Sequence, residues 1–285
     1  MREMVWLDGH LMPAAEASVP IGDRGLLFGD GVYEVYRLYG GRPFRRAEHL
    51  ARFARSAAGI RLVLPAVDWD AVQGALLQAN GLQVADAVIY AQATRGAAAT
   101  RAHAFPASGA HTLFVTARPL GAPPPALYRD GAAAIVRPDQ RWGRVDIKSI
   151  NLLPNVLAAQ EAAEAGAWEA LLVRDGALTE GTRTNLFALV DGRLRTHPEG
   201  AHILSGITRA AVLEAAHGAG VEVDEEAVGI HELRLVRELF VCGTTAEVLP
   251  VTTLEGRPVG DGRRGPVTAR LMDELARLVA RETAG

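Results

Sequence analysis

Two kinds of apolar pattern divide the N-terminal half of the chain into predicted strands and helices. Residues 32–39 alternate with a period of two and are rich in β-branched and aromatic side chains, which predicts a strand. Residues 48–58 and 70–80 carry apolar side chains at helical spacing and end near a glycine, which predicts two helices. Short apolar runs predict further strands at residues 87–94 and 112–117.

The same patterns return after a proline-rich stretch. They predict strands at residues 132–136, 170–173 and 239–242, and helices near 155–165, 209–217 and 267–281. Three Asp-Gly pairs, at residues 8–9, 175–176 and 191–192, predict tight hairpin turns. The repeated mixture of elements predicts an α+β protein with two domains, each with mixed sheets and helices.

The proline-rich stretch itself is the predicted boundary. Residues 119–126 read PLGAPPPA, a stiff and extended sequence that is typical of a linker. We therefore expect a small N-terminal α/β domain over residues 1–118, a linker over 119–126 and a larger domain over 127–285.

Composition and charge exclude several classes of protein. The apolar fraction of 49% and the charged fraction of 22% are those of an ordinary globular protein, and the net charge of -3 gives no field that attracts nucleic acid or an anionic membrane. The single cysteine, Cys242, excludes an internal disulfide, and no Cys/His spacing resembles a metal site. We expect no secretion signal and no membrane-spanning segment, and hence a cytoplasmic location.

Lysine usage points to one residue. Lys and Arg together number 30, yet Lys148 is the only lysine in the chain. A position that stays lysine under such a bias could need an amine that loses its proton and attacks a carbonyl, which arginine does not supply. The alternative is chance survival of one surface lysine, and composition alone leaves both open.

Other residues further along the chain suit pyridoxal phosphate chemistry. That cofactor needs an amine for its aldehyde and an anion for its pyridine nitrogen, and Glu180 in LTEGTRTN is a candidate anion, although a glutamate in a turn is usually solvated. The turn around Gly206 and Thr208 opens a predicted helix, where free amides favour a phosphate. Gly243 and Thr244 form a second turn with similar donors, although turns of both kinds often serve only as caps.

A series of motifs spread over nearly the whole chain resembles one known family. In sequence order they are DRGLLFGDGVYEV, EHLARF, QATRG, RAHAFP, RWGRVDIKSINLLPN, LTEGTRTNLF, THPEGAHILSGITR and ELFVCGTTAEVLPV. They are similar to the fold-type IV pyridoxal phosphate enzymes, which include D-amino-acid, branched-chain and R-selective amine transaminases and aminodeoxychorismate lyase. The chain is most similar to the D-amino-acid aminotransferases, and the resemblance implies a two-domain fold-type IV enzyme that uses pyridoxal 5'-phosphate.

The resemblance implies a role for each matching residue. Lys148 would carry the cofactor as a Schiff base and move the α-proton of the substrate. Glu180 would pair with the pyridine nitrogen, and Leu204 would pack against the ring. The phosphate would be held by Arg52, Gly206, Ile207, Thr208, Gly243 and Thr244.

The RAHAFP motif bears on the substrate. By resemblance, Arg101 and His103, together with Tyr33, would bind the α-carboxylate, and a guanidinium, an imidazole and a phenol are suitable donors for that group. In the family this loop reaches across a dimer interface, which implies a homodimer with shared active sites. We expect a ping-pong transfer of the amino group from D-amino acids, such as D-alanine or D-glutamate, to 2-oxo acids.

Other interpretations remain open at this point. A branched-chain L-amino-acid transaminase, an R-amine transaminase and aminodeoxychorismate lyase share the cofactor, and a non-enzymatic protein that binds pyridoxal phosphate or another phosphate is a further alternative. Two departures from the D-amino-acid pattern matter: the TRGAAATRAH segment is one residue longer than expected, and Arg183 replaces a small or hydroxylated residue. Arg183 could crowd the substrate side, anchor a second carboxylate or point to solvent.

Overall fold

The computed structural model describes residues 3–107, 111–121 and 123–284. The chain forms two compact units. The first unit comprises Met1–Gly121 and Ile147–Asn151, and the second comprises Ala122–Asp146 and Leu152–Gly285. The predicted C-terminal domain included residues 147–151, and with them Lys148, whereas this segment packs with the N-terminal elements.

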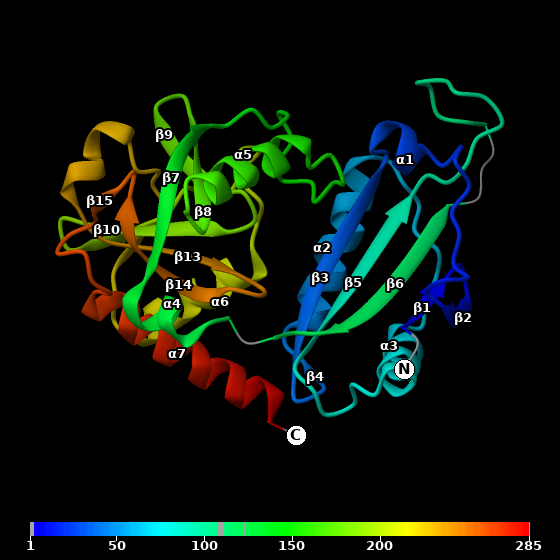
Figure 1. Ribbon diagram of the computed structural model, residues 1–285, viewed down its shortest axis with the longest axis horizontal. Helices are drawn as coiled ribbons and strands as arrows, with labels where there is room; N and C mark the ends of the chain where they lie inside the picture. Colours follow the sequence, from blue (N-terminus) through cyan, green and yellow to red (C-terminus); the bar gives the residue numbers. More distant parts are fainter. Residues whose placement is uncertain (1–2, 108–110, 122, 285) are drawn as a thin grey trace. The chain divides into compact units, whose positions relative to one another are not determined.

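The first unit is built on an antiparallel sheet of six strands in the order β2-β1-β6-β5-β3-β4 (Figure 1). Side chains of β3 alternate between buried and half-buried, as expected for a strand with one face on a core. Helix α2 packs against β3, and α3 packs against β1 and β6. The elements are β1 (Met4–Leu7), β2 (His10–Pro13), α1 (Arg24–Phe28), β3 (Gly31–Tyr39), β4 (Arg42–Pro43), α2 (Arg46–Gly59), α3 (Trp69–Asn80), β5 (Ala87–Thr94) and β6 (Thr112–Pro119).

The second unit contains a mixed sheet of nine strands, ordered β12-β11-β10-β13-β14-β7-β8-β9, with β15 paired to β14. Strands β14, β7 and β8 run parallel, while β8–β9, β10–β13 and β13–β14 are antiparallel. Helices α6 and α7 pack on each other and on β13, and α5 packs on β7 and β8. The elements are α4 (Pro125–Asp130), β7 (Ala132–Pro138), α5 (Leu153–Glu164), β8 (Glu169–Arg174), β9 (Ala177–Gly181), β10 (Asn185–Val190), β11 (Arg193–Arg195), α6 (Ile207–Gly218), β12 (Val223–Asp224), the 3₁₀ helix η1 (Ile230–Leu235), β13 (Val236–Gly243), β14 (Glu247–Leu254), β15 (Arg257–Pro258) and α7 (Pro266–Thr283).

The predicted α+β class is confirmed, although the mixed sheet occurs in the second unit only. All three predicted Asp-Gly turns are present, and their aspartates have φ values of 46° at Asp8, 52° at Asp175 and 47° at Asp191. Positive φ at both turn residues matches the twist of a two-residue hairpin, which is why these pairs mark the turns so clearly. None of the helices in the described ranges is long and apolar enough to cross a membrane.

Two short helices are absent from the predicted elements. Helix α1 forms because Asp23 caps its N-terminus, and Gly29 ends it in a left-handed conformation with φ 66°. The proline-rich stretch ends in α4, with Pro125 in the first turn. Proline suits that position because its fixed φ is helical and its missing N–H would have no partner there.

The core of the second unit generates a stability prediction. Phe187 on β10 and Phe240 on β13 are fully buried neighbours whose rings stack with centroids 5.1 Å apart. Phe187→Ala should lower the free energy of unfolding by about 3–5 kcal/mol, because it removes buried area and leaves a cavity. Denaturant unfolding followed by circular dichroism measures this change.

The matched control is Val84→Ala, which truncates a side chain that is 86% exposed. Its effect should stay within about 0.5 kcal/mol. An equal loss of stability in both variants would contradict the assignment of Phe187 to a tightly packed core.

Candidate active site

Lys148 is held by its backbone beside β3 in the first unit. Its N–H donates to Ser56 Oγ at 3.0 Å, and its carbonyl accepts from the N–H of Tyr33 at 3.0 Å. The Lys148 Nζ lies 4.3 Å from the centroid of the Tyr33 ring. Over the described residues this amine forms no hydrogen bond or ion pair. The nucleophilic atom is therefore positioned without being committed to a partner.

A buried carboxylate follows Tyr33 on the same strand. Glu34 is 1% exposed and accepts hydrogen bonds from Arg52 Nε (2.8 Å), Arg52 Nη2 (2.6 Å) and His49 Nδ1 (3.0 Å). Burial raises the pKa of Glu34, but Arg52, His49 and Lys148 outweigh it and hold that pKa well below its usual range. An ionised Glu34 only accepts, so the proton of neutral His49 sits on Nδ1. Burial keeps the pKa of His49 below its ordinary value.

Arg101 and His103 are both exposed on the loop after β5. Both touch the ring of Phe28 in α1: the Arg101 Cζ lies 4.8 Å from its centroid, and the His103 ring meets it edge-on at 5.5 Å. Arg101 forms no ion pair within the part of the chain that the structure describes. Its charge is therefore available for an external carboxylate.

Glu180 is the centre of a buried polar network in the second unit. It lies on β9, and its Oε2 accepts from Asn185 Nδ2 at 2.9 Å and from the N–H of Leu204 at 3.0 Å. Its Oε1 is hydrogen-bonded to Arg141 Nη1. Burial raises the pKa of Glu180, and the Arg141 charge opposes that shift. All three partners donate and so favour the carboxylate form, but burial outweighs them and the pKa of Glu180 stays raised.

Arg141 is in turn fixed by a second carboxylate. Its Nε and Nη2 donate to Asp139 at 2.9 and 2.7 Å, and the Arg141 residue is 8% exposed. Burial alone raises the pKa of Asp139, but the Arg141 hydrogen bonds and charge outweigh it and lower that pKa. One buried guanidinium therefore bridges two acids and sets the position of Glu180.

The predicted phosphate-binding turns are also in the second unit. Gly206 is the N-cap of α6, with extended backbone at φ -70°, and Ile207 and Thr208 are the first helical residues. The N-cap residue is a glycine, without a side chain to cap the turn, and none of the first helical residues is acidic. Its amides and the helix dipole therefore favour an anion. Gly243 and Thr244 lie where β13 ends and the turn to β14 begins.

Arg183 is exposed, and its guanidinium lies over the ring of Trp168, with Cζ 4.6 Å from the ring centroid. This stacking accords with the surface alternative among the three considered for Arg183. The turn that carries it is tied down by buried Glu169, which accepts from Thr182 N at 3.1 Å and from Thr184 Oγ1 at 2.9 Å. A substrate contact by Arg183 stays a prediction.

The predicted residues are thus divided between the two units. Those in the first unit are Tyr33, Arg52, Arg101, His103 and Lys148, and those in the second are Glu180, Arg183, Leu204, Gly206, Ile207, Thr208, Gly243 and Thr244. Within the first unit, Lys148 and Tyr33 are in contact and Arg101 and His103 share Phe28. Within the second, Glu180 and Leu204 are hydrogen-bonded.

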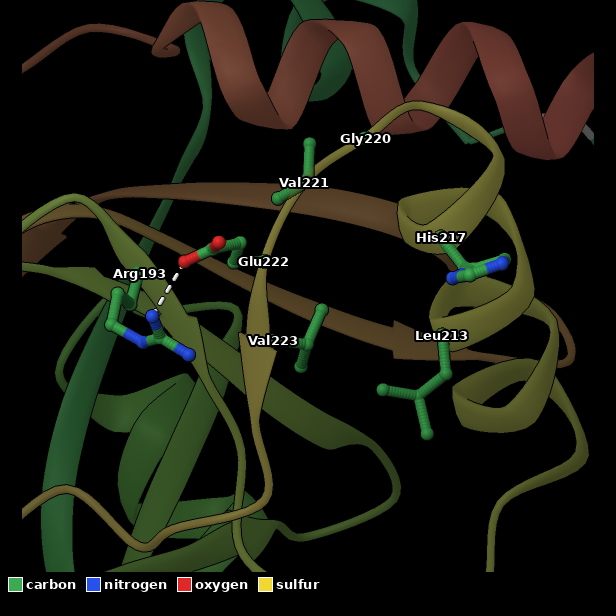
Figure 2. A pocket seen from close by; sticks show the side chains of 7 residues that line it. All are labelled: Arg193, Leu213, His217, Gly220, Val221, Glu222 and Val223. Atoms are coloured by element: carbon green, nitrogen blue, oxygen red, sulfur yellow. Dashed lines mark hydrogen bonds and ion pairs between the residues drawn. The ribbon is translucent and has the colours of Figure 1, made fainter.

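A surface pocket of the second unit contains none of the predicted residues. Figure 2 shows its lining, which comes from α6, from the connection between α6 and β12, and from β11 and β12, namely Arg193, Leu213, His217, Gly220, Val221, Glu222 and Val223. The Arg193 guanidinium is already paired with Glu222 at 2.5 Å and with Asp224 at 2.5 Å. The pocket therefore offers no uncommitted charge for a ligand.

Comparison with known proteins decides the family. The model of the family described as amino-transferase class IV matches residues 31–254. The chain belongs to the class IV aminotransferases. It is 41% identical to a D-alanine aminotransferase of Bacillus licheniformis over 282 residues, which cover 98% of each chain. A D-alanine aminotransferase of Listeria monocytogenes is 39% identical over 273 residues, covering 94% of this chain and 93% of the relative.

Solved structures of class IV aminotransferases share the fold. A branched-chain amino acid aminotransferase of Escherichia coli superposes with a TM-score of 0.88 at 30% identity, covering 100% of this chain and 97% of the other. A branched-chain amino acid aminotransferase of T.th., solved with pyridoxamine 5'-phosphate, gives a TM-score of 0.87 at 31% identity, covering 99% of this chain and 95% of the other.

The donor set of this class IV aminotransferase fits pyridoxal 5'-phosphate, the cofactor of its family. Lys148 supplies an uncommitted amine, and Glu180 supplies a buried carboxyl group that Arg141 and Asn185 hold in place. The first turn of α6, whose N-cap is Gly206, supplies amides for a phosphate. These are the three kinds of group that the cofactor requires.

Sequence reasoning missed the residues that hold the predicted ones in place. Glu34 was detectable, because it occupies a core-facing position in the alternation of β3, between the buried Val32 and Tyr36. A charge there requires a partner, and His49 and Arg52 lie three residues apart on the next helix. Arg141 gave no comparable signal, because Asp139 is a local partner of an ordinary kind and Glu180 comes from a separate segment of the chain.

Neutral His49 makes the stability of the protein depend on pH. Its pKa lies below the ordinary 6.5, so its contribution is complete above pH 6.5 and is lost as the pH falls below that value. The lowered pKa of Glu34 acts in the same direction, with a contribution that is lost only as the pH falls below about 4.5. We expect the free energy of unfolding to fall between pH 7 and 5 and the fall to be smaller in His49→Gln.

Urea unfolding at several pH values measures this slope. His10→Gln is the control, because His10 is exposed and its replacement should keep the wild-type slope. If His49→Gln also kept that slope, His49 would not be the group that titrates.

Proposed function

We propose that this class IV aminotransferase transfers the amino group of D-amino acids, of the D-alanine or D-glutamate type, to 2-oxo acids in a ping-pong reaction. The observation that carries the proposal is the uncommitted charge of Arg101, next to His103 on one loop, in a chain 41% identical to a D-alanine aminotransferase. The two branched-chain aminotransferase structures share the fold at 30–31% identity. A shared fold supports the assignment of the cofactor more than the assignment of the substrate. The expected cytoplasmic location stays a prediction.

Each proposed role follows from the local chemistry of its residue. Arg101 forks onto the α-carboxylate of the substrate, and His103 and Tyr33 add donors to it. The phosphate is held by the α6 turn at Gly206, Ile207 and Thr208, by the Gly243–Thr244 turn and by Arg52. Leu204 packs against the ring.

Lys148 holds the cofactor covalently through Nζ and, once released, takes the proton from the substrate Cα and returns it. When bound, the cofactor withdraws electrons from Cα, so that this proton becomes acidic. Glu180 keeps the pyridine nitrogen protonated through its negative charge, which Arg141 and Asn185 hold in place.

The first test uses the absorbance of the purified holoenzyme. The cofactor band should disappear on addition of D-alanine or D-glutamate and persist with L-leucine. Borohydride reduction should leave the cofactor attached to the peptide containing Lys148, which is the only lysine side chain in the protein. Lys148→Ala should lose this attachment and turnover, as measured by peptide mass and by 2-oxo acid formation.

The substrate anchor is tested separately. Arg101→Met should raise the KM for D-alanine by about tenfold or more, because it removes charge-assisted hydrogen bonds to the carboxylate. Arg118→Met, which removes an exposed arginine paired with Glu3, is the matched control.

In the absorbance test, loss of the cofactor band with L-leucine alone would move the protein to the branched-chain group. A band that persists with all three amino acids would point to amines or to the lyase reaction.

We also propose that the enzyme is a homodimer. Helix α5 carries three exposed apolar side chains at one-face spacing: Leu153 is 68% exposed, Val156 57% and Leu157 53%. Contiguous apolar surface of this kind favours a protein interface, and a second copy of the chain is the proposed occupant.

Sedimentation tests this assembly. The wild type should sediment at twice the chain mass of 30.3 kDa, and Leu157→Asp should shift it toward the monomer, because a buried unpaired charge is costly. Val84→Asp places the same charge at another exposed apolar position and should stay dimeric. A monomeric wild type, or a dimer unaffected by Leu157→Asp, would contradict the proposed interface.

A further inference from the structure

The loop that carries Arg101 and His103 has little structure of its own. Residues 99–107 form neither helix nor strand. Among the described residues, the hydrogen bonds to this stretch all come from one side chain, Arg24. A loop without backbone hydrogen bonds to a neighbouring strand or within a turn adopts many conformations unless a group outside the loop selects one of them. Arg24 is that group.

Arg24 binds three consecutive carbonyl oxygens of the loop. Its Nη1 donates to Ala102 O at 2.6 Å and to Ala104 O at 3.3 Å, and its Nη2 donates to His103 O at 3.1 Å. The Arg24 residue is 3% exposed. A buried guanidinium has five donors in a fixed plane, so it fixes the course of the backbone that bends around it.

The other end of the Arg24 guanidinium is anchored by Asp30. Arg24 Nε donates to Asp30 Oδ2 at 2.7 Å, and Arg95 donates to the same carboxylate at 2.9 and 3.0 Å. Burial alone raises the pKa of Asp30, but the hydrogen bonds from Arg95 and Arg24 outweigh it and lower that pKa. Arg95 also stacks on Phe105 of the loop, with Cζ 3.7 Å from the ring centroid.

Phe28 links this clamp to the two predicted substrate-binding side chains. Its ring is contacted by Arg24, with Cζ 4.8 Å from the centroid, as well as by Arg101 and His103. The helix that carries Phe28 starts at Asp23, whose carboxylate accepts from Thr94 Oγ1 at 2.9 Å and Thr112 Oγ1 at 2.7 Å. The support of the loop therefore extends into the sheet.

We propose that Arg24 is a positioning residue that sets substrate affinity by holding the 99–107 loop in the conformation that presents Arg101 and His103. The proposal rests on the proposed function, in which those two side chains bind the substrate carboxylate. The hydrogen bonds of Arg24 go to the loop backbone and to Asp30, so Arg24 affects the substrate only through the conformation of the loop. Its loss therefore weakens carboxylate binding and leaves proton transfer by Lys148 unchanged.

The test compares Arg24→Met and Arg24→Lys with a matched control, Arg37→Met. Arg37, like Arg24, is paired with an aspartate, Asp86, although Arg37 is half-buried where Arg24 is buried. It lies opposite Val88 on β5, whereas the loop follows Thr94 at the end of β5, opposite Gly31. Arg24→Lys keeps the charge and loses the planar fork, so it should lie between the wild type and Arg24→Met.

Two measurements are made on the holoenzymes. Hydrogen–deuterium exchange of the peptide spanning residues 99–107 should become severalfold faster in Arg24→Met and stay at the wild-type rate in Arg37→Met. The KM for D-alanine should rise about tenfold in Arg24→Met, while kcat stays within about threefold and the cofactor absorbance is unchanged.

Wild-type exchange and KM in Arg24→Met would overturn the proposal, as would a loss confined to kcat. If Arg24→Met failed to fold, Arg24→Lys and Asp30→Asn would decide the question, because each weakens the clamp while keeping a polar side chain. A wild type that does not consume D-alanine would refute the proposed function, while the exchange measurement would still show whether Arg24 orders the loop.

Discussion

Pairs of a buried carboxylate and an arginine fork hold the functional side chains of both units in place. Glu34 is bound by Arg52 in the first unit, and Glu180 is bound by Arg141 in the second. A buried charge is tolerated only when it is paired and hydrogen-bonded, so each pair has few acceptable geometries. Because each pair is costly to break, it also fixes the segments bonded to it. The Glu34–Arg52 pair fixes α2 beside the strand that holds the Lys148 segment, and the Glu180–Arg141 pair fixes the turn at Leu204.

The high arginine content of the chain matters because arginine and lysine differ in geometry. A planar fork binds two atoms of a carboxylate or several carbonyls at once, as Arg24 does with three consecutive loop residues. Lysine offers a single charged point on a flexible stem. Arginine holds Glu34, Glu180 and the 99–107 loop in fixed orientations, whereas the amine of the one lysine has no such partner among the described residues.

Fold and substrate are carried by different parts of this protein. The two-unit fold is shared with branched-chain aminotransferases at TM-scores of 0.87–0.88, whereas the D-alanine aminotransferases share more of the sequence. A common scaffold can host several specificities because binding residues are often carried on loops and turns. The stretch from Arg101 to Phe105 and the turn at Arg183 belong to no helix or strand.

The sequence by itself determined the longer helices, several of the strands, the Asp-Gly hairpins, the family and the presence of a single lysine. These follow from local periodicity, from turn conformations that few residues adopt, from motifs spread along the chain and from composition. Only the tertiary structure decided that residues 147–151 pack with the first unit, that Arg141 meets Glu180, and that Arg24 hydrogen-bonds three carbonyl groups of the 99–107 loop. The reason is that ion pairs and backbone clamps join residues far apart in the chain, and no local pattern states which buried charges will meet.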